Sequence, residues 1–154
     1  MKSLKLKVEK VMSAYRVLNE AKYQKLSDGD KVKVWKITRL LKPIATQCEE
    51  DIVDARQKMM PDKDFAENIQ KAEQYERMMK NNQTEGLPLT SEEYLEIAKK
   101  FKEYSDLLTK ALKEPLEKEV ELEIDTIGED AFGKLMSSND WNFSQVSDIE
   151  FMIE

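Results

Sequence analysis

The sequence predicts a mostly α-helical protein, and three observations lead to that prediction. Charged residues make up 36% of the 154 residues and hydrophobic residues 40%, with only four Gly and four Pro, a balance typical of helix-rich proteins. Apolar residues recur at spacings of three and four in several long stretches. Strand-like alternation occurs only at residues 4–8 and 120–124. We therefore expect a long antiparallel helical hairpin or bundle with a minor two-stranded β-sheet and a short C-terminal helix.

A chain of 154 residues has the length of one compact unit. We expect a single helical domain over residues 1–154, with a variable insertion and loop at 61–89 and an acidic strand plus terminal helix at 116–154. No stretch approaches the ~20 apolar residues of a membrane span, and the first residues lack the apolar run of a signal peptide. These features predict a soluble intracellular protein.

The first third predicts a short strand and two helices. Leu4, Leu6 and Val8 alternate with lysines, which favours a strand before a helix that begins near Val8. Ser27 is a candidate N-cap for the second helix. Its apolar positions form a heptad-like seam that continues past Pro43, where we expect a bend. The seam consists of Val34, Ile37, Leu41, Ile44, Cys48, Ile52, Ala55 and Met59.

The middle of the chain predicts two more helices separated by a loop. Pro61 is suited to the first turn of a weakly apolar helix, and residues 81–89, "NNQTEGLPL", read as a loop. Thr90 and Glu93 then form a capping-box pattern. The helix that follows has a second seam with spacings of 3, 4, 3, 4 and 3, and Pro115 is expected to interrupt it. This α-helical seam consists of Tyr94, Ile97, Phe101, Tyr104, Leu108 and Ala111.

After Pro115 the spacing of the apolar residues changes from three and four to two. Val120, Leu122 and Ile124 alternate with acidic residues, which indicates a half-buried strand. Its best partner is the lysine-flanked segment at 4–8, because cross-strand Lys and Glu pairs favour that pairing. A helical turn and loop, "FGKLMSSND", should follow. The final short helix has Asn142 or Ser144 as its cap, with Val146, Ile149 and Phe151 or Met152 facing inward.

The composition argues against several kinds of catalytic site. The chain has no His and one cysteine, Cys48, so the commonest general base is missing and neither an internal disulfide nor a cysteine-based zinc site can form. Cys48 lies on a packing seam, where a buried thiol is expected. No Gly-rich phosphate loop or nucleophile elbow occurs. We expect a protein that is not an enzyme and that has no cofactor and no metal site.

Two acidic stretches need separate consideration. Glu92, Glu93 and Glu96, followed by Glu103 and Asp106, resemble the magnesium-binding carboxylates of all-helical nucleotide pyrophosphohydrolases. In those enzymes the two groups lie on different helices, whereas here no turn separates them. A solvated helix face is therefore the preferred interpretation, and a magnesium-dependent nucleotide hydrolase is the third hypothesis. Glu50 and Asp54 are similarly interpreted as surface residues.

Charge is distributed unevenly along the chain. Residues 1–44 carry 12 Lys and Arg against 4 Asp and Glu, whereas residues 45–154 carry 13 against 27. A basic end can bind nucleic acid, or it can pack against acidic helices. Tyr15, Tyr23 and Trp35 lie among these lysines, but Trp35 adjoins the core position Val34, and two of these aromatics are more simply core or seam residues. Nucleic-acid binding is the alternative function.

The acidic C-terminal segment contains candidate partner-binding side chains. From Glu114 onward it has 12 acidic residues against two lysines, and such amphipathic segments dock into grooves of other proteins. The same residues could instead cap this protein's own hairpin. The two seams also leave apolar surface that self-association would bury. The candidate partner-binding residues are Trp141, Phe143, Phe151 and Met152.

Three stretches together resemble small uncharacterised proteins of bacteriophages and of prophages in gut bacteria. The stretches are "AYRVLNEAKYQKLSDGDKVKVWKITRLLKPIATQCEEDIVDARQKM", "EEYLEIAKKFKEYSDLLTKALKEPLEKEVELEID" and "LMSSNDWNFSQVSDIEFMIE". The likeness covers most of the chain but includes no functional signature. It implies a phage-encoded interaction or assembly protein of unknown specific role, in the cytoplasm of the host cell or associated with the virion. A protein partner or a second copy is expected, with no membrane or small-molecule substrate.

Overall fold

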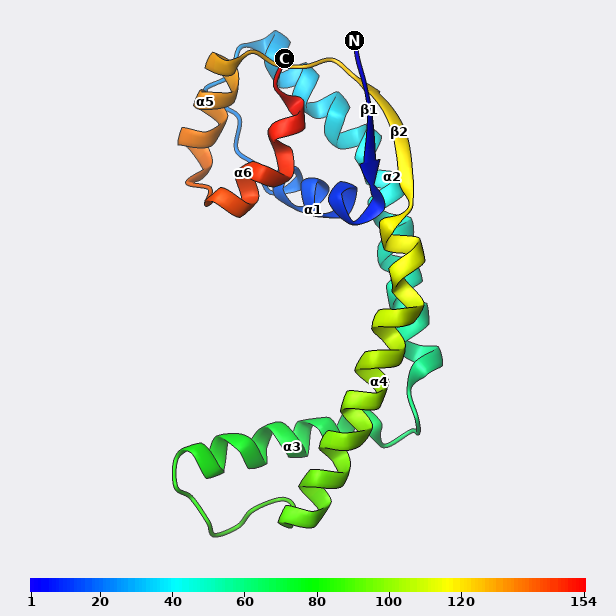
Figure 1. Cartoon of the computed structure of the whole chain (residues 1–154). Coiled ribbons are helices and arrows are strands. Elements are labelled where there is room, and N and C mark those ends of the chain that lie inside the picture. Colours follow the sequence, from blue (N-terminus) through cyan, green and yellow to red (C-terminus); the bar gives the residue numbers. More distant parts are fainter. The chain divides into compact units, whose positions relative to one another are not determined.

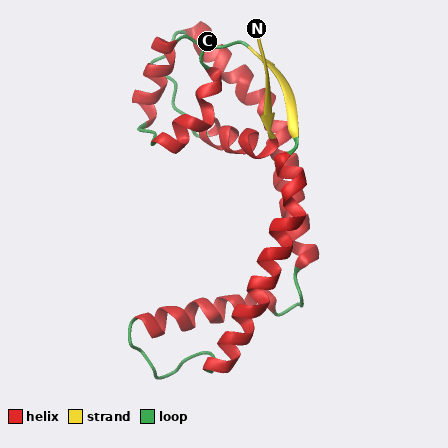
Figure 2. Ribbon diagram, viewed as in Figure 1, coloured by secondary structure: helices red, strands yellow, loops and turns green.

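A computed structural model describes all residues from 1 to 154 and shows the expected mostly helical fold with one small sheet (Figures 1 and 2). The chain divides into two compact units, a division that the single-domain expectation did not include. Unit 1 contains Met1–Asp51 and Glu114–Glu154, and unit 2 contains Ile52–Lys113. The elements are β1 (Lys2–Lys7), α1 (Val8–Asn19), α2 (Asp28–Met59), α3 (Phe65–Lys80), α4 (Ser91–Glu117), β2 (Glu119–Ile124), α5 (Glu129–Asn139), α6 (Phe143–Ile149) and the 3-10 helix η1 (Glu150–Met152).

The predicted pairing of the two strands is confirmed. β1 runs antiparallel to β2, with Leu4 opposite Leu122 and Lys5 opposite Glu121. The Lys5 ammonium lies 3.4 Å from the Glu121 carboxylate. Both side chains are exposed, so this ion pair contributes little energy. Burial of the apolar alternate residues therefore provides most of the stability of the pairing, and the charges favour this register.

The core of unit 1 gathers residues from both ends of the chain. Val34, Ile37 and Leu41 of α2 are buried together with Leu135 of α5 and Ile149 of α6. Their spacing of three and four along α2 places them on one side of that helix. The heptad-like prediction for this part of α2 therefore locates a real packing face.

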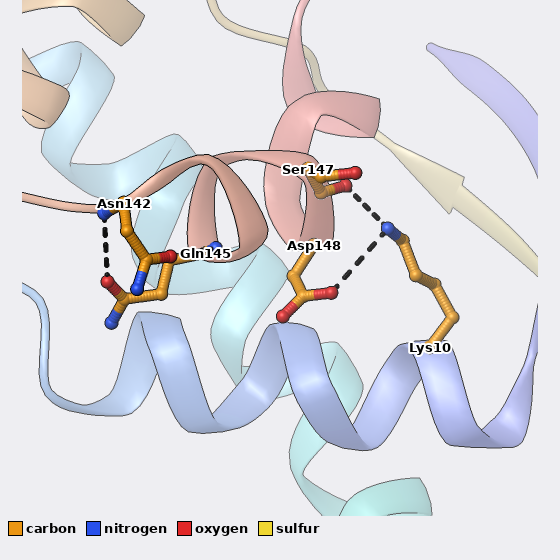
Figure 3. A network of polar contacts seen from close by, with 5 residues as sticks. All are labelled: Lys10, Asn142, Gln145, Ser147 and Asp148. Atoms are coloured by element: carbon orange, nitrogen blue, oxygen red, sulfur yellow. Dashed lines mark hydrogen bonds and ion pairs between the residues drawn. The ribbon is translucent and has the colours of Figure 1, made fainter.

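Polar contacts attach the C-terminal helix to α1 (Figure 3). The Lys10 ammonium donates to the backbone carbonyl of Ser147 at 2.5 Å and lies 3.8 Å from the Asp148 carboxylate. Asn142 caps α6, because its side chain accepts from the Gln145 N–H at 2.9 Å and Gln145 accepts from the Asn142 N–H at 3.1 Å. This capping box resolves the choice between Asn142 and Ser144.

Three boundaries differ from the sequence expectations. Pro61 lies outside α3, which begins at Phe65, because the Asp62 side chain accepts from the Asp64 N–H at 3.1 Å and holds a turn there. Pro115 does not end α4. The residues after Pro115 keep helical bonding, with the Lys118 N–H donating to the Glu114 carbonyl at 3.1 Å. The expected turn and loop after β2 is the eleven-residue helix α5.

Unit 2 has a smaller core. Ala72 and Tyr75 of α3 are buried with Leu89, and Tyr94 and Ile97 of α4 pack partly against them. The Tyr75 and Tyr94 rings stack with their centroids 4.6 Å apart. The expected loop at 81–89 joins α3 to α4, with Gly86 in the left-handed region at φ +70°.

The helices were also compared with the length and hydropathy of a membrane span, and none of them meets both requirements.

Adjacent leucines of α2 provide a test of the core of unit 1. Leu41 is completely buried, whereas Leu40 is 38% exposed. We expect Leu41→Ala to lower the free energy of unfolding by about 2–5 kcal/mol, because it leaves a cavity. The matched Leu40→Ala control should cost about 1 kcal/mol or less. Urea unfolding followed by circular dichroism measures both values, and equal losses would contradict the assigned packing face.

Candidate functional site

The four candidate partner-binding residues have different surroundings. Met152 is completely buried in the core of unit 1, and Trp141 and Phe151 pack partly against that core. Phe143, the first residue of α6, is 94% exposed. Partner binding by these residues stays a prediction. Met152 is not accessible to a partner in this fold, whereas Phe143 is almost completely exposed to solvent.

Trp141 lines a surface hollow of about 420 Å³ in unit 1. Arg16, Glu20, Lys22 and Asp140 also line it, so the hollow carries both signs of charge. The Asn139 side chain donates to the Lys22 carbonyl at 2.7 Å and accepts from the Lys22 N–H at 2.6 Å. These bonds attach the end of α5 to the segment after α1. The mixed charge does not select an anionic or a cationic ligand.

The acidic residues of α4 are spread over the exposed surface of the helix. Glu92, Glu93, Glu96, Glu103 and Asp106 are all exposed. Nowhere in the chain do three or more His, Cys, Asp or Glu residues lie close enough to hold a metal ion. The convergence of carboxylates that the magnesium hydrolase hypothesis requires is therefore absent.

Glu93 instead caps α4. Its carboxylate accepts from the Thr90 N–H at 3.1 Å, and the Thr90 hydroxyl accepts from the Glu93 N–H at 3.2 Å. These two bonds are the predicted capping box. Two hydrogen bonds with Thr90 lower the pKa of Glu93 below its ordinary value. The bond from the Thr90 backbone has the larger effect, and the bond with the Thr90 side chain has the smaller one. The perturbed carboxyl is thus explained by helix capping.

Cys48 is the buried thiol that its seam position predicts. Burial raises the pKa of the Cys48 thiol, and the charge of nearby Asp51 raises it further. A raised pKa lowers the fraction of the reactive thiolate. The environment of Cys48 therefore suits a packing role.

The second seam is much less covered than the first. We call Tyr94, Ile97, Phe101, Tyr104, Leu108 and Ala111 the α4 seam. None of the 27 residues of α4 is buried, although the same spacing in α2 produces the buried Val34, Ile37 and Leu41. Phe101, in the middle of the α4 seam, is 46% exposed. Leu107, which borders the seam next to Leu108, is 55% exposed.

Contacts from α3 reach only part of the α4 seam. The Phe65 ring lies 4.9 Å from the Tyr104 ring, between centroids, and the Tyr75 ring stacks on Tyr94. The Tyr94 hydroxyl donates to the Glu76 carboxylate. Aromatic contacts therefore hold the seam at two positions. Phe101 lies between these positions and keeps nearly half of its surface in water, which makes the seam the leading candidate interaction surface of unit 2.

Two aromatic residues of the basic N-terminal third are at the surface. Trp35 is 50% exposed and Tyr23 is 36% exposed, whereas Tyr15 packs partly against the core of unit 1. A core or seam position is therefore wrong for Trp35 and correct for Tyr15. The reason is helical geometry: one residue along an α-helix turns the side chain by about 100°, so the neighbour of buried Val34 points out of the core. Trp35 is not one of the seam residues of α2, and this sequence signal could have placed its ring at the surface.

Comparison of the chain with protein-family models, with curated proteins and with solved structures gives no match.

The capping role of Glu93 predicts a specific pH dependence. Because its pKa is lower in the folded chain than in the unfolded chain, the ionised carboxylate stabilises the fold above the unfolded pKa. That stabilisation disappears as the pH falls through the folded pKa. We expect carbon-detected NMR titration to place the pKa of Glu93 below its ordinary value, and Thr90→Ala to move it back upward. An ordinary pKa for Glu93 in the unaltered protein would contradict the capping geometry.

Proposed function

We propose that this chain is a non-enzymatic interaction or assembly protein that binds a second copy of itself through the α4 seam. The observation that carries the proposal is the absence of any buried residue along the 27 residues of α4, although its apolar residues repeat at helix-packing spacing. Fully burying a large apolar side chain contributes about 1.5–3 kcal/mol relative to leaving it exposed. Burying the open surface of Phe101 and Leu107 would supply part of this energy.

The spacing of the α4 seam favours a symmetric antiparallel partner. The intervals 3, 4, 3, 4 and 3 are the same in both chain directions. Two antiparallel copies can therefore place Phe101 opposite Tyr104 and Ile97 opposite Leu108. In each of these pairs, a residue at heptad position a meets a residue at heptad position d, which suits packing across a two-fold axis.

The charges beside the seam also favour the antiparallel arrangement. Reversal about the middle of α4 brings the acidic stretch 92–96 alongside Lys110 and Lys113. It also brings the lysines of 99–102 alongside Glu103 and Asp106. A parallel pairing in register would bring like charges together, which is unfavourable. At about 1.5 Å per residue, the 27 residues of α4 give a contact line roughly 40 Å long.

The resemblance to small phage and prophage proteins implies an assembly role in a phage context. Many assembly proteins act as closed symmetric oligomers, and the symmetric seam spacing fits such a unit. A phage-encoded accessory is the setting that we propose. The structural argument for a second copy depends only on α4 and does not require this origin.

Analytical ultracentrifugation at protein concentrations from about 5 to about 200 μM tests the proposed dimer, because mass action favours the dimer as the concentration rises. We expect the unaltered chain to sediment as a dimer at the upper concentrations. Phe101→Ser combined with Leu107→Ser should weaken association at least ten-fold, because both changes remove apolar surface at the proposed contact.

Leu95→Ser is the matched control for this experiment. Leu95 is 65% exposed on α4. It lies about 100° around the helix from the nearest seam residue, whereas Leu107 borders the seam, so replacement of Leu95 should leave association unchanged. A monomer at the highest concentration would overturn the proposal. An effect of Leu95→Ser as large as that of the double variant would also overturn it.

A further inference from the structure

A second surface, in unit 1, combines open aromatic rings with cations. A hollow of about 410 Å³ lies between α1, the segment that follows α1, and α2. We call it the basic-aromatic hollow, and no carboxylate lines it. Its volume is within the range of about 300–1,000 Å³ that is usual for small-ligand sites. The lining residues used below are Tyr15, Tyr23, Trp35, Arg39 and Lys42.

Two of the three aromatic rings of this hollow, those of Tyr23 and Trp35, lie outside the core, whereas Tyr15 packs partly against it. Trp35 is half exposed, and the buried positions of this part of α2 are Val34, Ile37 and Leu41. Leaving a large ring in water gives up favourable burial energy, so an open ring beside a hollow indicates a contact surface. Tyr23 contributes a second partly open ring from the segment before α2.

The cations of the hollow are available to a ligand. The Arg39 guanidinium carbon lies 5.2 Å from the centre of the Trp35 ring, at the distance of a cation–π contact. Neither Arg39 nor Lys42 forms an ion pair or a side-chain hydrogen bond. Their positive charges are therefore not neutralised by the protein.

The cations also follow a line along α2. Lys31, Trp35, Arg39 and Lys42 are spaced by four, four and three residues, which places them on one side of the helix. Lys31 has a weak exposed contact with Asp28 at 3.9 Å. A ligand with one flat ring and repeated negative charges matches this order of side chains.

We propose that the basic-aromatic hollow binds single-stranded nucleic acid, with one base stacked on Trp35 and adjacent phosphates beside Arg39 and Lys42. Proteins that bind single strands without sequence preference combine a basic track with aromatic stacking platforms. An unpaired base has a free face for the indole, whereas the bases of a duplex are covered by their neighbours. An acidic peptide would use the cations but would leave the Trp35 ring without a stacking partner.

Fluorescence anisotropy with a labelled oligothymidine or oligouridine of about 15 nucleotides, near the upper end of single-strand site sizes, tests this proposal. At low salt, about 50 mM, we expect saturable binding to the full chain. Trp35→Ala should weaken binding by about 5-fold to 150-fold, since it removes the stacking of one base. Trp35→Phe keeps an aromatic ring and should restore part of the affinity.

The salt dependence separates the phosphate interactions from stacking. Removing one cation that binds a phosphate of a single strand should reduce the slope of log K against log salt by about 0.7. Arg39→Ala and Lys42→Ala should each approach this change, whereas Trp35→Ala should leave the slope nearly unchanged. Lys63→Ala is the matched control, because it removes an exposed positive charge in unit 2.

Three results would overturn the proposal. They are no binding at low salt, equal affinity for a duplex of the same length, and competition by poly-glutamate that is as effective as competition by unlabelled oligonucleotide. Circular dichroism and thermal melting should show that Trp35→Ala remains folded, since the ring is at the surface. The Phe101→Ser and Leu107→Ser double variant should retain nucleic-acid binding, so this site is tested independently of self-association.

Discussion

Unit 1 depends on one long-range interaction, the antiparallel pairing of β1 with β2. Residues 2–7 and 119–124 must meet before this sheet exists, so the pairing closes a loop of more than a hundred residues at an entropic cost. The apolar faces of Leu4 and Leu122 offset part of that cost by packing on the core. Once formed, the pairing brings α1 and α2 into the same unit as α5 and α6, and their buried residues form one cluster.

Sequence reasoning predicted most of the fold because the signals were local. The alternation at Val120, Leu122 and Ile124 indicated β2, and lysines at residues 5 and 7 indicated its partner. The Thr90 and Glu93 cap was also readable from spacing. The missed features depended on tertiary structure or on competing turns: the start of α3 after the Asp62 turn, and helix α5.

The candidate surfaces were harder to predict because a periodic pattern does not reveal how completely a face is covered. Leu41 and Phe101 occupy similar seam positions, yet only Leu41 is buried. Trp35 shows the complementary problem, because it was assigned from its neighbour Val34 but lies at the surface. For Met152 the sequence left two possibilities open, an inward position and a partner-binding one, and the residue lies in the core. The burial of a helix face depends on which elements of the same unit pack against it. The spacing of apolar residues alone does not specify those elements.

The pairing of β1 with β2 also has a consequence for synthesis on the ribosome. After Lys7 emerges, 111 residues separate it from Glu119, the first residue of β2. At about 5–20 residues per second, this interval corresponds to roughly 6–22 s. During that time β1 lacks its partner and offers free backbone groups to other nascent chains. Its lysines disfavour such association, because two copies of β1 would bring like charges together.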